Sequence, residues 1–156
     1  MANRAVMLLS PVSKKLPDDA RILNALGTAS AVQGRFDDAL GSWEKCLDID
    51  PDRDQTLDTV AILLQNAGRN REARVSLERF LKLNPWRANA WGRHSRLLGL
   101  EGEWEAAIVS AKKAEELDPS VPQTYQFLSD AYRQTGNASQ RRIYSERFEQ
   151  IKRLRK

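Results

Sequence analysis

The sequence offers few side chains that could carry out covalent or metal chemistry. His94 is the single histidine and Cys46 the single cysteine, and these residue types serve as general bases, nucleophiles and metal ligands. Both lie at places where the helical pattern of the chain puts core residues, far apart along the sequence. A zinc site needs more histidine and cysteine ligands than the chain contains. We therefore predict a buried His94 satisfied by a hydroxyl or carbonyl group, with no catalytic residue, no metal and no cofactor.

The carboxylates do not form an acid and base couple either. Four glutamates lie close to two lysines at helical spacing: Glu103, Glu105, Glu115 and Glu116, with Lys112 and Lys113. Carboxylates and lysines three or four residues apart on a helix form solvated surface pairs. No constellation of residues supports catalysis, so we predict that this chain is not an enzyme.

The elements that position these residues recur every thirty-four residues. Three series show the period: Pro17, Pro51, Pro85 and Pro119; Gly34, Gly68, Gly102 and Gly136; Ala5, Ala39, Ala73 and Ala107. Self-similarity at such a period is the signature of a stacked repeat architecture. Stacked repeats bury a continuous core between neighbours and expose extended surfaces rather than one cleft.

Each unit is predicted to contain two antiparallel helices. Apolar residues recur at helical spacing in two runs that the series glycine separates. The glycines end the first helices in a left-handed conformation, and the prolines end the second helices. The small residue at the eighth place, such as Gly27, is expected to face the alanine at the twentieth, Ala39. Ser120 and Asn137 are expected to cap the last two helices.

The residues that carry this pattern resemble the tetratricopeptide repeat (TPR). Trp91 takes the tryptophan place, Leu26 and Gly27 the Leu-Gly pair, and Tyr132 the tyrosine place. The resemblance implies an all-α fold, a right-handed α-solenoid of tandem helix-turn-helix repeats. It covers nearly the whole chain as a single TPR-like domain, residues 1–156, with repeats at 20–53, 54–87 and 88–121 and a fourth repeat with a C-terminal capping helix at 122–156.

The first nineteen residues depart from this pattern. Residues 1–19 map onto the second half of a repeat, with no first helix before them. We therefore expect either a segment of a longer protein or a lone N-terminal capping helix at residues 2–10, which Pro11 should end or kink.

The resemblance also implies a concave groove lined by the first helices, which in this family holds an extended peptide or a partner helix. The places opposite the packed face are mostly polar, and amide, guanidinium and carboxylate groups there can bind a peptide. The predicted groove residues are Arg21, Asn24, Thr28, Gln55, Asp58, Ile62, Gln65, Asn89, Arg93, Arg96, Gln123, Gln126, Asp130 and Arg133.

One subtype of the family can be tested at the residue level. Clamps for the acidic tails of heat-shock chaperones use lysines, asparagines and an arginine at set places. The matching places here are Asn24, Thr28, Thr59, Asn89 and Arg93. Arg93 alone fits, so we predict that the partner is not an acidic chaperone tail.

Charge restricts the partner class only weakly. The net charge is +4, which is a small excess and not a polybasic signature. A basic run extends through the middle repeats: Arg69, Arg71, Arg74, Arg79, Lys82, Arg87, Arg93 and Arg96. An acidic partner or RNA could use it, but the aromatic residues that single-strand binders interleave with arginines are missing, so nucleic acid is not favoured. Trp86, after Pro85, is expected either to contact a partner or to pack over its loop.

No segment is long enough to insert in a membrane, and the single cysteine leaves the compartment open, with a soluble cytoplasmic protein weakly favoured. Our leading hypothesis is a protein-protein interaction scaffold, or adaptor, that captures a protein or peptide partner in the polar groove. The alternatives are a self-assembling structural scaffold, since a homo-oligomer is possible, and an accessory domain of a longer enzyme.

Overall fold

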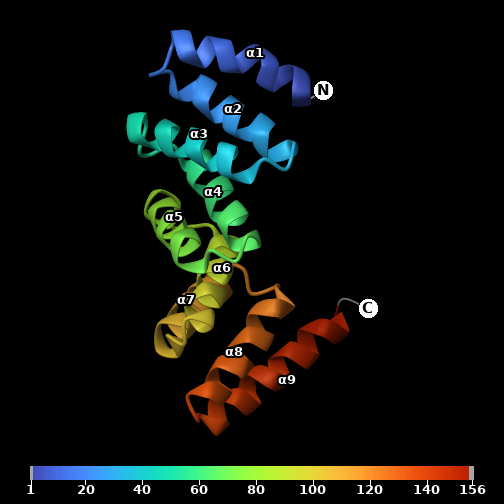
Figure 1. Cartoon of the computed structure of the whole chain (residues 1–156). Helices are drawn as coiled ribbons and strands as arrows, with labels where there is room; N and C mark the ends of the chain where they lie inside the picture. The colour runs from blue at the N-terminus through green and yellow to red at the C-terminus, as the bar shows by residue number, and fades with distance from the viewer. Residues whose placement is uncertain (1, 155–156) are drawn as a thin grey trace. The chain divides into compact units, whose positions relative to one another are not determined.

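The computed structural model describes residues 2–154, and the regular elements in that range are helices joined by short turns (Figure 1). Met1, Arg155 and Lys156, which the predicted domain includes, lie outside the described residues. The helices are α1 (Ala2–Lys15), α2 (Ala20–Val32), α3 (Phe36–Ile49), α4 (Asp54–Asn66), α5 (Asn70–Leu83), α6 (Ala88–Leu100), α7 (Trp104–Leu117), α8 (Pro122–Gln134) and α9 (Ala138–Leu154).

The predicted turns explain where these helices end. Gly34, Gly68, Gly102 and Gly136 have φ of 73°, 75°, 78° and 74°, the left-handed region that glycine enters without strain. Each of the helices α1, α3, α5 and α7 ends two residues before a series proline. The helix pairs begin at residues 20, 54, 88 and 122, so the predicted helix-turn-helix repeat is confirmed.

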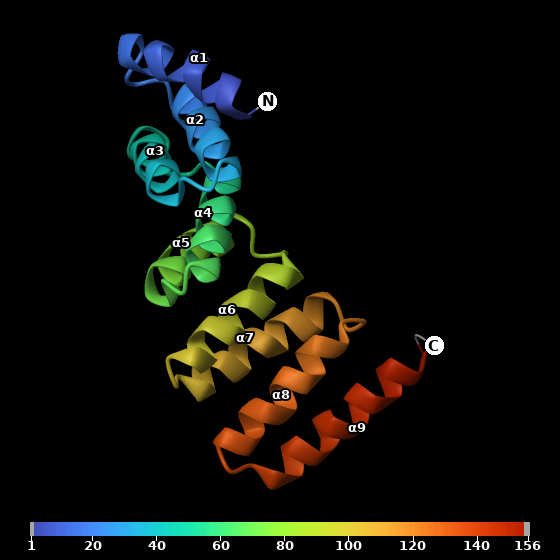
Figure 2. The ribbon, with the colours of Figure 1, turned by 45° about the vertical axis from the view of Figure 1, so that its right-hand side comes forward.

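The chain divides into two compact units, residues 1–69 and 70–156. In the first unit α1 packs on α2, α2 on α3, and α3 on α4 (Figure 2). In the second, α5 packs on α6, and α6 to α9 pack in succession, with α6 also touching α8. We describe each unit by itself, and the single domain spanning residues 1–156 stays a prediction.

The core of the first unit depends on one large side chain against one glycine. Trp43 is 1% exposed, and its indole N–H donates to the backbone oxygen of Asn24 at 3.2 Å. A Cβ atom added to Gly27 would lie 2.6 Å from the Trp43 ring. The nearest neighbour of Gly27 is thus Trp43 and not Ala39, as we had expected. Only glycine lets α2 and the Trp43 ring approach this closely.

The core of the second unit ends in a cluster of tyrosines. Tyr132 and Tyr144 stack with ring centroids 5.5 Å apart, and Tyr125 lies beside Tyr144 at 6.3 Å. The Tyr144 hydroxyl donates to Glu115 at 3.1 Å, and Arg147 also binds Glu115, at 2.8 Å. These contacts join α9 to α7 and α8, because buried phenol groups need hydrogen-bond partners.

Two local predictions are wrong. The helix predicted for residues 2–10 does not end at Pro11, since α1 continues through Pro11 to Lys15. Pro11 has no amide to donate to the carbonyl of Met7, four residues earlier, and Met7 is 76% exposed. That Pro11 kinks α1 stays a prediction. Ser120 does not cap α8: its hydroxyl donates to Asp118 at 2.7 Å, and Val121 occupies the cap position. Asn137 does cap α9, since its side chain accepts from the Gln140 amide at 3.1 Å.

Candidate functional site

A polar cavity of the second unit gathers four of the predicted groove residues. Asn89, Arg93 and Arg96 lie on α6 and Gln123 on α8, and all four line a cavity of about 330 Å³. The places two, five, six and nine of the repeat put the α6 side chains on one face, and α8 begins at Pro122, which fixes where Gln123 emerges. We call this cavity the α6–α8 pocket.

Apolar and small residues form the rest of the α6–α8 pocket. Phe127, Val121, Ala88 and Ala114 line it together with Gly92. A Cβ atom added to Gly92 would meet no atom within 4 Å, so this glycine keeps part of the space open. The combination of an apolar lining and a few convergent polar groups is that of a binding site.

The electrostatics of the α6–α8 pocket are dominated by two guanidinium groups. Desolvation, and then the charge of Arg93, lower the pKa of Arg96, although arginine stays protonated at neutral pH. Asp118 at the edge of the pocket accepts hydrogen bonds from the amide and hydroxyl of Ser120, at 2.9 and 2.7 Å. Two positive charges that face the same cavity favour an anion between them.

Two further predicted residues line a separate, smaller cavity. Gln126 and Asp130 of α8 face α9 across about 220 Å³, with Ser145, Phe148 and Glu149 opposite. Arg133, one turn further along α8, forms an ion pair with Asp130 at 3.2 Å. The predicted residues of α8 therefore divide between a basic cavity and an acidic one.

In the first unit, the predicted groove residues of α2 make contacts within the protein. Arg21 binds Asp19 through two hydrogen bonds of 3.2 and 2.9 Å, and this lowers the pKa of Asp19 to about 2. Asp19 in turn caps α2. The side-chain oxygen of Asn24 accepts from Thr56 of α4 at 2.9 Å, and the Thr28 hydroxyl donates to the Asn24 carbonyl. These residues hold α2 in place in addition to lining its surface.

The predicted residues of α4 remain accessible. Gln55 and Ile62 are exposed, and Asp58 and Gln65 are half-buried. The Gln55 carbonyl accepts from the hydroxyl of Thr59 at 2.8 Å. None of the fourteen predicted residues belongs to the buried core of the described chain, so whether they form a binding groove stays a prediction.

Comparison with protein families identifies the repeat. Family models described as tetratricopeptide repeat match residues 20–53 and residues 61–122, which together are more than half of the chain. The chain belongs to the tetratricopeptide repeat family. The predicted all-α solenoid of helix-turn-helix repeats is thereby confirmed.

Solved structures of MamA have the same fold as this TPR protein. A crystal structure of MamA superposes with a TM-score of 0.86 at 21% identity, covering 99% of this chain and 90% of that one. MamA AMB-1 gives 0.90 at 22% identity over 97% and 83% of the two chains, and MamA MSR-1 gives 0.85 at 20% over 99% and 89%. At these identities the likeness shows the fold alone. No curated protein matches the sequence.

The functional class follows from the repeats. TPR arrays are in general interaction modules rather than enzymes, and they present extended surfaces to protein partners. This TPR protein is a protein-interaction scaffold. Within the described part of the chain, no helix is long and apolar enough to cross a membrane.

The two residues whose side chains could carry out chemistry, His94 and Cys46, have structural roles. His94 Nδ1 lies 3.0 Å from the Ser110 hydroxyl, the kind of partner that was predicted, and Nε2 lies 3.3 Å from Glu78. His94 is partly and not fully buried. Cys46 is fully buried, and desolvation raises the pKa of its thiol. Across residues 2–154, no three histidine, cysteine or acidic side chains are grouped closely enough to hold a metal ion.

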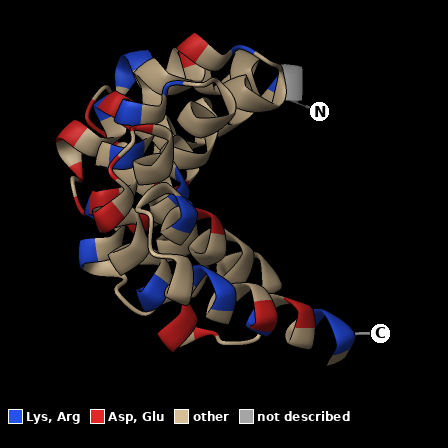
Figure 3. Ribbon diagram, turned by 90° about the horizontal axis from the view of Figure 1, so that it is seen from below, with Lys and Arg blue, Asp and Glu red and all other residues tan. Residues whose placement is uncertain are grey.

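The charged residues of the TPR helices are of both signs. Figure 3 shows Lys and Arg interspersed with Asp and Glu along the helices. Arg74 of the basic run contacts three carboxylates, those of Glu78, Glu101 and Glu103, at 3.2 to 3.7 Å. That part of the run is neutralised within the protein. Trp86 is 64% exposed, which keeps it available as a contact residue.

A further cavity, in the first unit, was not predicted from the sequence. About 580 Å³ lies open among α1, α2 and α3. The small residues Ser10 and Gly41, at places where the second unit has Glu78 and Val109, are the signal in the sequence that could have indicated it. Phe127 was also missed, because its place in α8 suits the core as well as a pocket.

Proposed function

We propose that this protein binds an extended segment of a protein partner on the polar face of its first helices, with the α6–α8 pocket as the main point of contact. One observation carries the proposal: Asn89, Arg93, Arg96 and Gln123, predicted independently from their places in the repeat, line one cavity. Guanidinium groups bind carboxylates strongly, and side-chain amides can pair with a peptide backbone.

The chemistry of the pocket specifies the segment further. A carboxylate of the partner would lie between Arg93 and Arg96, while an adjacent aliphatic or aromatic side chain would contact Phe127 and Val121. The volume of about 330 Å³ accommodates one or two side chains and not a folded element. The predicted residues further along α8 would then contact flanking parts of the segment.

A library of random peptides displayed on phage and selected on the whole protein tests this proposal. We expect enriched peptides to carry Asp or Glu, and their affinity to fall at least tenfold in an Arg96→Glu variant, because a like charge replaces the partner of the carboxylate. Arg71→Glu is the matched control, since Arg71 is an exposed arginine of α5 outside the pocket.

Equal binding of the peptides to both charge-reversed variants would contradict the α6–α8 pocket as the contact. An Asp58→Lys variant, measured separately, reports whether the polar face of the first unit takes part. Circular dichroism of each variant verifies that the helices are intact.

Self-assembly is a second candidate, which exposed apolar residues of α1 and of the turn that follows it favour. Met7 and Leu8 of α1 are 76% and 62% exposed, and Leu16, just after α1, is 52% exposed. Exposed apolar residues of this kind suit an interface. Mass photometry and sedimentation velocity over a range of concentrations test it. A Leu8→Lys and Leu16→Lys double variant should stay monomeric at concentrations where the wild type associates, and a concentration-independent monomer for both would contradict this candidate.

A further inference from the structure

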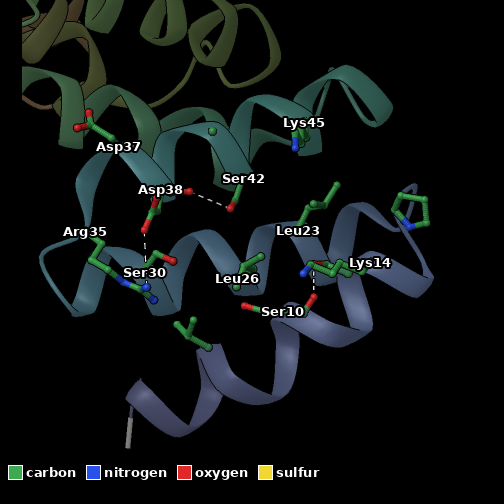
Figure 4. A pocket seen from close by; sticks show the side chains of 14 residues that line it. Ser10, Lys14, Leu23, Leu26, Ser30, Arg35, Asp37, Asp38, Ser42 and Lys45 are labelled. Carbon is green, nitrogen blue, oxygen red and sulfur yellow. Dashed lines mark hydrogen bonds and ion pairs between the residues drawn. The ribbon is translucent and has the colours of Figure 1, made fainter.

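The open cavity of the first unit has an apolar floor and polar walls. It measures about 580 Å³. Val6, Leu23 and Leu26 contribute the apolar side chains, and Ser10 of α1 and Ser42 of α3 contribute hydroxyl groups from opposite sides (Figure 4). We call it the α1–α3 cavity. It shares no residue with the predicted groove: the α2 residues that line it are Leu23, Leu26 and Ser30, whereas the predicted groove residues of α2 are Arg21, Asn24 and Thr28.

The corresponding space of the second unit holds side chains that contact one another. Two repeats later in the sequence, Val6 corresponds to Arg74, Ser10 to Glu78, Leu26 to His94, and Ser42 to Ser110. There Arg74 lies 3.4 Å from Glu78, and His94 bridges Glu78 at 3.3 Å and Ser110 at 3.0 Å. The second unit thus closes with its own side chains the space that the first leaves open.

The charges around the α1–α3 cavity are separated along its length. Arg35 forms an ion pair with Asp38 at 3.7 Å, near one end, where Asp37 also lies (Figure 4). Lys14 and Lys45 lie toward the other end, and within residues 2–154 neither has an ion-pair partner. Asp37 and Lys45 are eight residues apart on α3, which corresponds to about 12 Å along the helix. One end of the cavity therefore carries two uncompensated ammonium groups.

We propose that the α1–α3 cavity is a second binding site, which takes a segment of a partner protein that bears a carboxylate next to a large apolar side chain. The apolar side chain packs on Leu23 and Leu26, and the carboxylate lies at the end that holds Lys14 and Lys45. Charge complementarity selects the acidic group, because Glu78, the carboxylate of the second unit, is replaced by Ser10 here. Burial of the apolar group supplies the main driving force.

Two glycines offer a matched pair of blocking variants. Gly41 of α3 lines the α1–α3 cavity, and Gly92 of α6 lines the α6–α8 pocket. A Cβ atom added to either would meet no atom within 4 Å. Both lie inside helices, where leucine is a better helix former than glycine. Gly41→Leu and Gly92→Leu should each occupy one cavity while the helices stay folded.

The experiment selects displayed random peptides on the whole protein and removes those that also bind the Gly41→Leu variant. We expect the surviving peptides to combine Asp or Glu with Leu, Ile or Phe. Measured by fluorescence anisotropy as synthetic peptides, they should bind Gly92→Leu like the wild type and Gly41→Leu at least tenfold more weakly. If no peptide survives the subtraction, or if Gly92→Leu weakens binding as much as Gly41→Leu, the proposed site is wrong.

A charge reversal separates specific recognition from a loss of folding. The double variant Lys14→Glu, Lys45→Glu should bind the selected peptides at least tenfold more weakly than the wild type does. It should bind versions of these peptides whose carboxylate is replaced by lysine more tightly than the wild type does. Unchanged affinities for both versions would overturn the assignment of the carboxylate to this end. If the proposal holds, the Arg96→Glu substitution leaves the affinity for these peptides unchanged. Failure of the proposed site in the α1–α3 cavity can therefore be distinguished from failure of the proposed site in the α6–α8 pocket.

Discussion

The space between α1 and α3 and the space between α5 and α7 occupy the same place in the repeat, yet one is open and the other is filled. The backbones follow the same register, and the serine of α3, Ser42, has an identical counterpart in Ser110 of α7. Arg74, Glu78 and His94 make the difference, since the first unit has shorter or apolar residues in their places. Side-chain size and polarity at three places thus distinguish the filled space from the open one.

A third copy of this place, between α7 and α9, is filled in another way. Tyr144 follows Ser110 by one repeat, and its ring stacks on Tyr132 where the other copies have a serine. An ion-pair network in one copy and an aromatic stack in another therefore fill equivalent spaces between helices. In both cases side chains of the chain itself occupy the space.

The two units also differ in the sizes of the side chains that face each other between neighbouring helices. The first unit combines Gly27 with Trp43, while the corresponding places of the second hold Ser95 and Ala111. Trp43→Ala should lower the free energy of unfolding of the first unit by about 3–5 kcal/mol, because it creates a large cavity. Ala111→Gly should cost about 1 kcal/mol, mainly through helix propensity.

Hydrogen exchange read by mass spectrometry checks this prediction unit by unit. Trp43→Ala should remove protection from α2 to α4 and leave α6 to α9 protected. Equal loss of protection throughout residues 2–154 would show that the units unfold together, as a single domain would.

The aromatic filling between α7 and α9 should make the second unit sensitive to alkali. Desolvation and Glu115 raise the pKa of Tyr144 to about 12. Because an ordinary tyrosine titrates near pH 10, the neutral phenol contributes its full stability below about pH 10, and this contribution is lost as the pH rises toward 12. The loss is at most about 3 kcal/mol.

Denaturant midpoints at pH 9 and pH 11.5 measure this effect, and Tyr144→Phe is the control, because it keeps the ring without the ionisable group. The wild type should lose more stability than Tyr144→Phe over this interval. Parallel losses in the two proteins would assign the sensitivity to other groups, among which Tyr125 also has a raised pKa through desolvation.

Replacing Ser42 and, separately, Ser110 by tyrosine compares the open space between α1 and α3 with the filled space between α5 and α7. Ser42→Tyr should change the free energy of unfolding by less than about 1 kcal/mol, because the α1–α3 cavity has room for the ring. Ser110→Tyr should cost about 1–3 kcal/mol by overpacking, since Ser110 is 4% exposed and contacts His94. Urea denaturation followed by circular dichroism measures both, and equal costs would contradict the openness of the first unit.

Much of the fold could be predicted because its determinants are local. Proline and glycine constrain the backbone of their own neighbours, so the helix ends follow from their positions. The errors occurred where the chain departs from these local rules: α1 continues through Pro11, and the Ser120 hydroxyl donates to Asp118 instead of capping α8. A single sequence does not reveal such competition.

The candidate site was predictable in part. The place in the repeat correctly put Asn89, Arg93, Arg96 and Gln123 on surface-facing parts of their helices, because helical periodicity sets direction. Periodicity does not tell how far apart two helices lie or what fills the space between them. The α1–α3 cavity depends on such distances, and Asn24, whose side chain accepts from Thr56, shows that a polar residue on a predicted surface can also serve packing.

Glycine is required in this chain for two different reasons. At Gly27 the reason is lack of space, since an added Cβ would strike the Trp43 ring. At Gly34, Gly68, Gly102 and Gly136 there is open space for a Cβ, but φ is positive. The obstacle there is chirality: the left-handed region that strains an L-amino acid is the natural one for its mirror image. D-alanine, introduced by chemical ligation at these exposed turns, should therefore be accepted where L-alanine is strained, whereas at Gly27 it is the space occupied by the Trp43 ring that excludes L-alanine.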